Sequence, residues 1–161
     1  NVVELNWWQH RAQDDWLFTA VPAQHFSGRT ATDRNKTLWA GWVLQHEGRK
    51  FYFAGDTGYS DDFKNIGEYF GGIDIAFIPI GAYSPRWFMQ PMHINPEEAV
   101  KIHKDIRAKQ SFAMHWGTFK LTDEAFLEPK QLLNEALITA GLGIDTFQAI
   151  EHGKTVSMYF K

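Results

Sequence analysis

Polar residues of the kind that bind metal ions follow the apolar segments of this sequence. His25 comes shortly after one such segment, Asp56 comes directly after a second, and His115 ends a third. His93 lies in the loop that follows a fourth. Ligands of an α/β sheet bind beyond the carboxyl ends of its strands, so side chains at these positions are expected to converge. Imidazole and carboxylate groups together suit Zn²⁺ or a similar divalent ion, and we therefore predict a metal site there.

Each of these residues also has an ordinary structural interpretation. A histidine near a strand end is commonly a hydrogen-bonded residue without a ligand, and Asp56 stands in Gly-Asp-Thr-Gly, where aspartate suits a turn. The sequence has no cysteine, which excludes disulfides, thiolate metal ligands and a cysteine nucleophile. Four further histidines stand at positions to which we assign no role: His10, His46, His103 and His152.

The composition is that of a folded domain. Of the 161 residues, 44 % are apolar and 22 % are charged, which excludes a disordered or collagen-like chain. A net charge of −3 without a block of Lys or Arg argues against a nucleic-acid partner. The longest stretch without a charged residue, 16–28, is too short and too polar to span a bilayer, and no signal peptide opens the chain. We expect a cytoplasmic location, with peripheral contact to a membrane left open.

The apolar segments that precede the candidate residues have the pattern of strands. Segments 37–45 and 50–54 flank a short Glu-Gly-Arg turn and predict a hairpin. The continuous apolar run 73–80 predicts a strand buried on both faces. The remaining expected strands are 1–6, 16–21 and 111–115, followed by a closing hairpin of 147–150 with 155–160.

Helices are expected between these strands. Asn95 suits a helix N-cap, Pro96 suits the first helical position, and Glu97 favours the first turn through the helix dipole. Further helices are expected over 61–70 and 129–140. Residues 1–161 therefore read as a single α/β unit.

Five motifs together resemble those of one hydrolase family. They are Ala54-Gly-Asp-Thr-Gly-Tyr59, Ile78-Pro-Ile-Gly-Ala-Tyr83, Pro85-Arg-Trp-Phe-Met89, His93-x-x-Pro-Glu-Glu-Ala99 and His115-Trp-Gly-Thr118. The set resembles the metallo-β-lactamase-fold hydrolases, in particular the N-acyl-phosphatidylethanolamine-hydrolysing phospholipases D. Pro22-Ala-Gln-His25 continues the match, which runs over nearly the whole chain.

The resemblance implies a dinuclear zinc hydrolase that cleaves a lipid phosphodiester. It implies that His25 and His115 each ligate one zinc ion and that Asp56 bridges the two. It places His93 beside the metals, in contact with the substrate head group, so that Asp56 and His93 are the expected catalytic residues. Three further residues are expected to touch substrate, through a phosphate oxygen or an acyl chain: Arg86, Trp87 and Phe88.

The family's His-x-His-x-Asp-His motif does not occur in the 161 residues. The expected fold is therefore the carboxyl-terminal half of an αββα sandwich: one mixed sheet with helices on its outer face and an apolar inner face left exposed. Zinc occupancy is then expected to be reduced or absent in this chain alone. An inactive half-domain that forms a homo-oligomer or pairs with a separate first half is the alternative from another class. A phosphorylated-sugar lactone hydrolase is the alternative enzyme.

Overall fold

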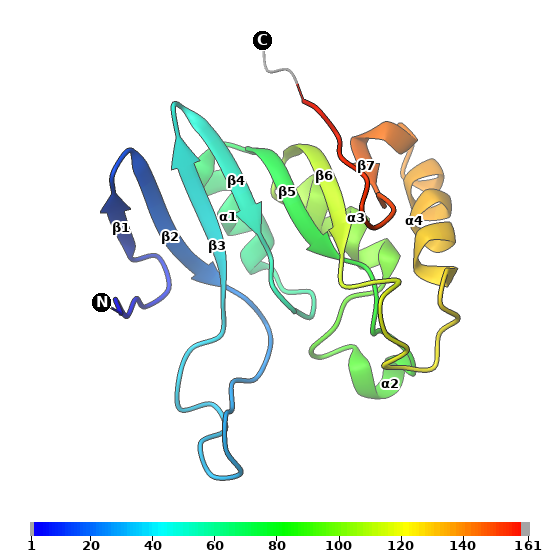
Figure 1. Cartoon of the computed structure of the whole chain (residues 1–161), viewed down its shortest axis with the longest axis horizontal. Helices are drawn as coiled ribbons and strands as arrows, with labels where there is room; N and C mark the ends of the chain where they lie inside the picture. Colours follow the sequence, from blue (N-terminus) through cyan, green and yellow to red (C-terminus); the bar gives the residue numbers. More distant parts are fainter. Residues whose placement is uncertain (1, 159–161) are drawn as a thin grey trace.

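A computed structural model describes residues 2–158 of the chain (Figure 1). The described residues form one seven-stranded sheet whose strands lie side by side in chain order. The strands are β1 (His10–Gln13), β2 (Trp16–Pro22), β3 (Ala40–His46), β4 (Arg49–Phe53), β5 (Ile73–Pro79), β6 (Ala108–Met114) and β7 (Phe147–Gln148). The helices are α1 (Asp62–Phe70), α2 (Arg86–Met89), α3 (Pro96–Asp105) and α4 (Glu128–Thr139), with the 3₁₀ turn η1 (Ile144–Thr146).

The sheet is mixed, as the sequence predicts. Strands β1 to β4 pair antiparallel, and β4 to β7 pair parallel. Because β2 and β4 are both antiparallel to β3, strands β2, β4, β5 and β6 all run in one direction. Their carboxyl ends therefore share one edge of the sheet.

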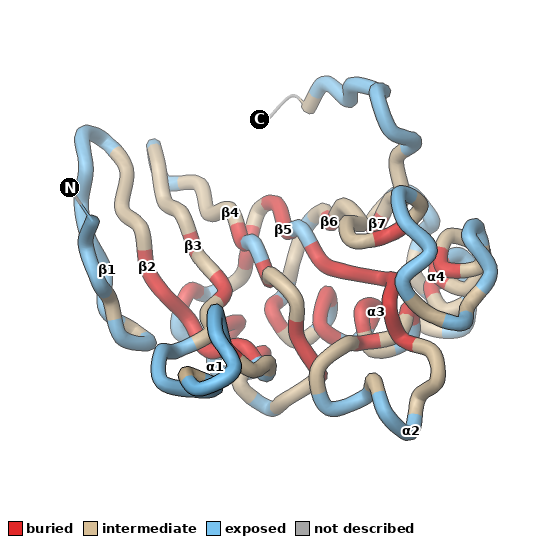
Figure 2. Tube along the Cα trace, turned by 60° about the horizontal axis from the view of Figure 1, so that its bottom comes forward, coloured by how far each residue is buried: buried red, intermediate tan, exposed pale blue. Residues whose placement is uncertain are grey.

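The hydrophobic core lies between one face of the sheet and the helices α1, α3 and α4 (Figure 2). Ile78 of β5, Ile66 of α1 and Ile102 of α3 are fully buried in it. Helix α3 begins as predicted: Asn95 accepts a hydrogen bond from the Glu98 N–H, and the Glu98 carboxylate accepts one from the Asn95 N–H. This capping box fixes the residue at which the loop before α3 ends.

Aromatic side chains line the opposite face of the sheet. The register places four of them side by side across β3 to β6: Trp42, Phe53, Phe77 and Phe112. Phe53 is 46 % exposed and Phe77 is 38 % exposed. Large hydrophobic side chains grouped in this way on a surface mark a site of interaction. The exposed apolar face expected from the sequence is confirmed.

The structure differs from the predicted elements at both ends of the chain. Residues 2–6 form no strand, and the first strand is instead β1, whose four residues are all exposed. The closing hairpin is also wrong, because β7 pairs parallel with β6 and residues 155–158 form no strand. Positions 159 and 160 of that hairpin lie outside the described residues. None of the helices in residues 2–158 is long and apolar enough to cross a membrane.

Candidate metal centre

Four loops at the shared carboxyl edge bring the predicted residues together. His25 follows β2 and Asp56 follows β4, while His93 lies in the loop after β5 and His115 directly follows β6. One ligand atom from each of His25, Asp56 and His93 lies within 4.8 Å of the other two. His115 Nε2 lies 3.4 Å from Asp56 Oδ1. The structure thus brings the three histidines together around the Asp56 carboxylate.

Thr57 ties the neighbouring loops to the one that carries Asp56. The Thr57 side chain is fully buried, and its Oγ1 accepts a hydrogen bond from the Gln24 N–H at 2.9 Å. Its carbonyl oxygen accepts one from the Ile94 N–H at 2.9 Å. Gln24 directly precedes His25 and Ile94 directly follows His93, so these two bonds set where both histidines stand relative to Asp56.

An aromatic environment orients the His25 ring. Its Nδ1 lies 2.7 Å from the Phe26 carbonyl oxygen, which only accepts, so Nδ1 is the donor of this bond and Nε2 is the ring nitrogen left for a ligand. The ring centroid lies 4.5 Å from that of Phe26 and 4.6 Å from that of Trp39. Trp39 also donates its indole N–H to the Asp56 carbonyl oxygen at 2.8 Å. One side chain therefore contacts two of the candidate ligands.

Arg86 is already bonded within the protein. Its Nη1 donates to the His93 carbonyl oxygen at 2.7 Å and its Nη2 donates to Glu98 Oε2 at 2.8 Å. Both contacts hold the His93 loop against the start of α3. The next two residues on α2 point outward, since Trp87 is 83 % exposed and Phe88 is 56 % exposed.

Backbone geometry positions His115. Its φ of 58° lies in the left-handed region, which turns the chain as β6 ends. The backbone of Gly81 packs so closely that a Cβ at this position would lie 2.2 Å from the His115 carbonyl oxygen. Only glycine leaves room for this approach. The following residue, Trp116, is buried in the hydrophobic core and so fixes the start of the loop between β6 and α4.

The electrostatics of the cluster follow from these contacts. The hydrogen bond with His115 holds the pKa of the Asp56 carboxyl below its usual range, against the opposing effect of burial. The same bond raises the pKa of His115. Burial lowers the pKa of His93, so its imidazole is neutral near pH 7. The cluster thus offers an ionised carboxylate next to a neutral imidazole, which are the forms that bind metal.

The donor set fits a divalent metal ion. Ligand atoms of His25 and His93 lie within 4.8 Å of an Asp56 carboxylate oxygen, and His115 Nε2 lies 3.4 Å from Asp56 Oδ1, so imidazole and carboxylate donors can converge on an ion whose bonds to them are about 2 Å long. His93, which the resemblance places beside the metals, thus lies within the same 4.8 Å of Asp56 as the expected ligand His25. Two histidines with one carboxylate also form the ligand set of non-haem iron sites. The chemistry of the donors therefore admits zinc and iron alike.

A family model described as "Beta-lactamase superfamily domain" matches residues 1–116. The chain belongs to this superfamily. It is 49 % identical over 142 residues to N-acyl-phosphatidylethanolamine-hydrolyzing phospholipase D 1 of Caenorhabditis elegans, with 84 % of this chain and 40 % of that protein covered. It is 45 % identical over 162 residues to the mitochondrial N-acyl-phosphatidylethanolamine-hydrolyzing phospholipase D of Saccharomyces cerevisiae, with 96 % of this chain and 34 % of that protein covered. The chain thus spans roughly two fifths or less of the length of these relatives.

Solved structures agree with this family assignment. Igni18, a metallo hydrolase of Ignicoccus hospitalis, superimposes with a TM-score of 0.73 at 26 % identity, covering 99 % of this chain and 61 % of that one. CmlA, a diiron β-hydroxylase of Streptomyces venezuelae, has a TM-score of 0.63 at 16 % identity over 93 % of this chain and 33 % of that one, and therefore shares the fold alone. The resemblance to a metallo-β-lactamase-fold family close to the N-acyl-phosphatidylethanolamine-hydrolysing phospholipases D is confirmed.

Sequence reasoning missed the residues that support the ligands. Neither Thr57 nor Trp39 is of a residue type that binds metal, and their bonds to neighbouring loops are seen only in the folded chain. Gly81 carried a signal, because a glycine directly after a buried strand often marks a close backbone approach. In the sequence, Gly81 stands in Ile78-Pro-Ile-Gly-Ala-Tyr83, a motif that indicates the hydrolase family but does not indicate this contact.

Proposed function

We propose that this chain is part of a metal-dependent phosphodiesterase of phospholipase D type that acts on N-acyl-phosphatidylethanolamine-like lipids. The observation that carries the proposal is the convergence of His25, Asp56, His93 and His115 at the carboxyl edge of the sheet. Relatives with that activity in their names, 45–49 % identical to the chain, support the substrate class.

His25, Asp56 and His115 are the residues that would hold zinc, two ions in the whole enzyme, with Asp56 shared between them. When bound, zinc supplies Lewis-acid polarisation of the phosphoryl group that is attacked. The ionised Asp56 carboxylate would supply the negatively charged ligand, and the Thr57 and Trp39 bonds keep its loop in place. These bonds belong to the chain, so the ligands stand in place before any substrate arrives.

His93 is the residue proposed to act on the substrate. Because burial keeps its imidazole neutral, one ring nitrogen can donate a proton while the other accepts one. It can therefore hold an oxygen of the phosphoryl group or of the head group. Arg86, whose guanidinium is bonded to the His93 carbonyl oxygen and to Glu98, acts in this proposal by positioning His93.

The exposed rings of Trp87 and Phe88 lie on α2, just before the His93 loop. Aromatic side chains of this kind favour the interface between a bilayer and water. We propose that they meet the lipid surface or the acyl chains of the substrate and give the protein a peripheral contact with the membrane.

The test compares the zinc-loaded whole enzyme, which contains this chain, with two site variants of that enzyme on N-acyl-phosphatidylethanolamine in mixed micelles, measuring release of N-acylethanolamine. Asp56→Asn and His93→Gln are each expected to lower turnover at least about 100-fold, the usual effect of removing a group that acts in the transition state. His10→Gln, on the exposed strand β1, is the matched control and is expected to keep wild-type turnover. Wild-type turnover by Asp56→Asn would overturn the proposal, and faster cleavage of a phosphorylated-sugar lactone would favour the alternative enzyme.

The aromatic sheet face favours a second candidate, a non-catalytic half-domain. Phe53 and Phe77 remain well exposed in the chain described here, which suits association with a second copy or with a separate first half of the fold. Native mass measured over a range of concentrations tests this candidate. A monomer at all concentrations that retains zinc and cleaves the lipid would exclude it.

A further inference from the structure

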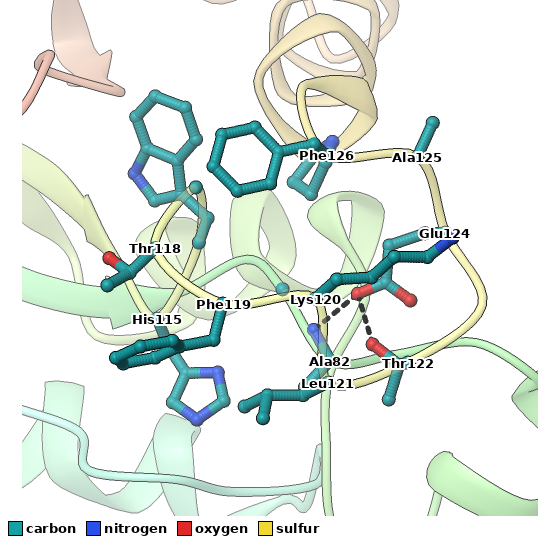
Figure 3. A pocket seen from close by; sticks show the side chains of 14 residues that line it. Ala82, His115, Thr118, Phe119, Lys120, Leu121, Thr122, Glu124, Ala125 and Phe126 are labelled. Atoms are coloured by element: carbon teal, nitrogen blue, oxygen red, sulfur yellow. Dashed lines mark hydrogen bonds between the residues drawn. The ribbon is translucent and has the colours of Figure 1, made fainter.

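A pocket of about 260 Å³ lies against His115, on the side formed by the loop between β6 and α4 (Figure 3). Its walls are mainly apolar and include the side chains of Trp116, Phe119, Leu121 and Phe126. His115 is both a wall of this pocket and a member of the candidate metal cluster. A group that fills the pocket therefore lies next to the reacting part of a bound substrate.

Besides the cationic Lys120, the polar side chains of the loop that line this pocket are bonded within the protein. Glu124 Oε1 accepts hydrogen bonds from the Ala82 N–H at 2.6 Å and from the Thr122 hydroxyl at 2.7 Å, as Figure 3 shows. Its Oε2 accepts one from the Ser84 N–H at 3.1 Å. The Thr118 hydroxyl lies 3.1 Å from His152 Nε2. An uncharged, apolar ligand therefore loses nothing at these groups, whereas a cation would compete with three bonds already made to Glu124.

The loop carries exposed apolar side chains. Phe119 is 76 % exposed and Leu121 is 68 % exposed, although both line a concave surface. Exposed apolar side chains that line a concave surface are typical of ligand sites. The volume lies just below the roughly 300–1,000 Å³ usual for small-molecule sites, so the pocket suits one segment of hydrocarbon chain and not a whole two-chain lipid.

We propose that this pocket, the loop pocket, binds a single hydrocarbon chain of the substrate beside the metal centre. The proposal rests on the proposed function and deepens it, because it places a chain of the lipid at Leu121 and Phe126 and not only at the exposed rings of α2. The loop pocket then selects substrates whose phosphodiester carries an unbranched alkyl or acyl group.

The experiment uses p-nitrophenyl phosphodiesters whose second ester group is methyl, butyl, hexyl, octyl or decyl, with the zinc-loaded protein. For the wild type, KM is expected to fall up to about fourfold with each added methylene and then to level off when the loop pocket is full. Leu121→Ser and Phe126→Ser are expected to weaken this dependence on chain length. Leu127→Ser is the matched control, because Leu127 is on the same loop and similarly exposed (63 %) but does not line the pocket.

Two results would overturn the proposal: a wild-type KM that does not change with chain length, or a Leu121→Ser variant with the wild-type dependence. The second result would also arise if another part of the protein filled the loop pocket, and in that case too no substrate chain binds there. Failure of the proposed function is a separate result, in which none of the esters is cleaved. Calorimetric binding of butyl and octyl phosphate to the same variants then decides: octyl phosphate binding that is tighter in the wild type and in Leu127→Ser than in Leu121→Ser supports the pocket, and equal binding overturns it.

Discussion

Replacing Thr57 by valine removes the hydroxyl that joins two loops of the metal centre and keeps the shape of the side chain. Thr57 is fully buried, and its Oγ1 both accepts from the Gln24 N–H at 2.9 Å and donates to the Gly58 carbonyl oxygen at 2.7 Å. Valine fills the same space but leaves the Gln24 N–H without its partner. We expect Thr57→Val to destabilise the protein and to loosen His25, the residue that follows Gln24.

The size of the effect follows from the bonds lost. The bond from the Gln24 N–H to Thr57 is partly buried, so losing its acceptor should cost about 1–2 kcal/mol in free energy of unfolding, the lower part of the range for a buried donor left unpaired. The carbonyl of Thr57, which accepts from the Ile94 N–H, is unchanged by the substitution, so the link to the His93 loop remains. The loss should therefore fall on the His25 side of the centre alone. Thr57→Ser keeps the hydroxyl and is expected to recover most of the lost stability.

Urea unfolding followed by tryptophan fluorescence measures this change, together with zinc binding by calorimetry. With a slope of about 1–3 kcal/mol per molar urea, a loss of 2 kcal/mol lowers the midpoint by roughly 1 M. Thr139→Val is the matched control, because its hydroxyl bonds the Glu135 carbonyl on the exposed side of α4, and its effect should stay within about 0.5 kcal/mol. Wild-type stability and zinc affinity in Thr57→Val would refute the role given to this residue.

Three further substitutions or conditions probe the core, through His103, and the supports of the centre, through Trp39 and Gly81. Burial lowers the pKa of His103, so the unfolded chain takes up this proton first, and the free energy of unfolding should fall as pH drops below about 6.5; urea titrations at pH 7.5 and 5.5 should show a smaller difference for His103→Gln. Trp39→Phe keeps the ring but loses the bond to the Asp56 carbonyl, which should cost about 1 kcal/mol in urea unfolding and weaken zinc binding. Gly81→Ala brings a methyl group against the His115 carbonyl oxygen and should cost about 1–3 kcal/mol, with a matching loss of zinc affinity.

Two matched variants separate these effects from general ones. Trp87→Phe changes a tryptophan that is 83 % exposed and should leave stability and zinc binding as in the wild type. Gly143→Ala adds a methyl group whose nearest neighbour lies 3.8 Å away, an ordinary contact. If Gly143→Ala were as destabilising as Gly81→Ala, the close approach at His115 would not be the cause.

The strand-end pattern predicted which residues come together because the strand directions are regular. His25, Asp56 and His115 each stand just after a strand, and the sheet runs β2, β4 and β6 in the same direction. A pattern along the chain then becomes proximity in space. His93 belongs to the cluster for a different reason: a loop of more than ten residues after β5 returns to the edge and is tied there through Ile94 and Arg86.

The errors at the chain ends have the opposite origin. Residues 147–150 have the alternation of a strand, and Phe147 is fully buried, but its partner is β6 and not the tail. Local sequence indicates that a segment is extended and leaves open which neighbour it pairs with. Strand β1 was missed because His10–Gln13 is polar and exposed, so it lacks the apolar alternation by which strands are recognised.

Arg86 shows why residue type alone does not assign a role. The sequence predicts that Arg86 contacts a phosphate oxygen, and the structure shows its guanidinium between the His93 carbonyl oxygen and the Glu98 carboxylate. Glu98 also completes the cap of α3, so one carboxylate joins the start of that helix to the loop of His93. The position of His93 is thereby set by the helix, and Thr57 sets it a second time through Ile94. His93 is therefore held from two independent directions, and we expect it to keep its place when either contact is removed alone.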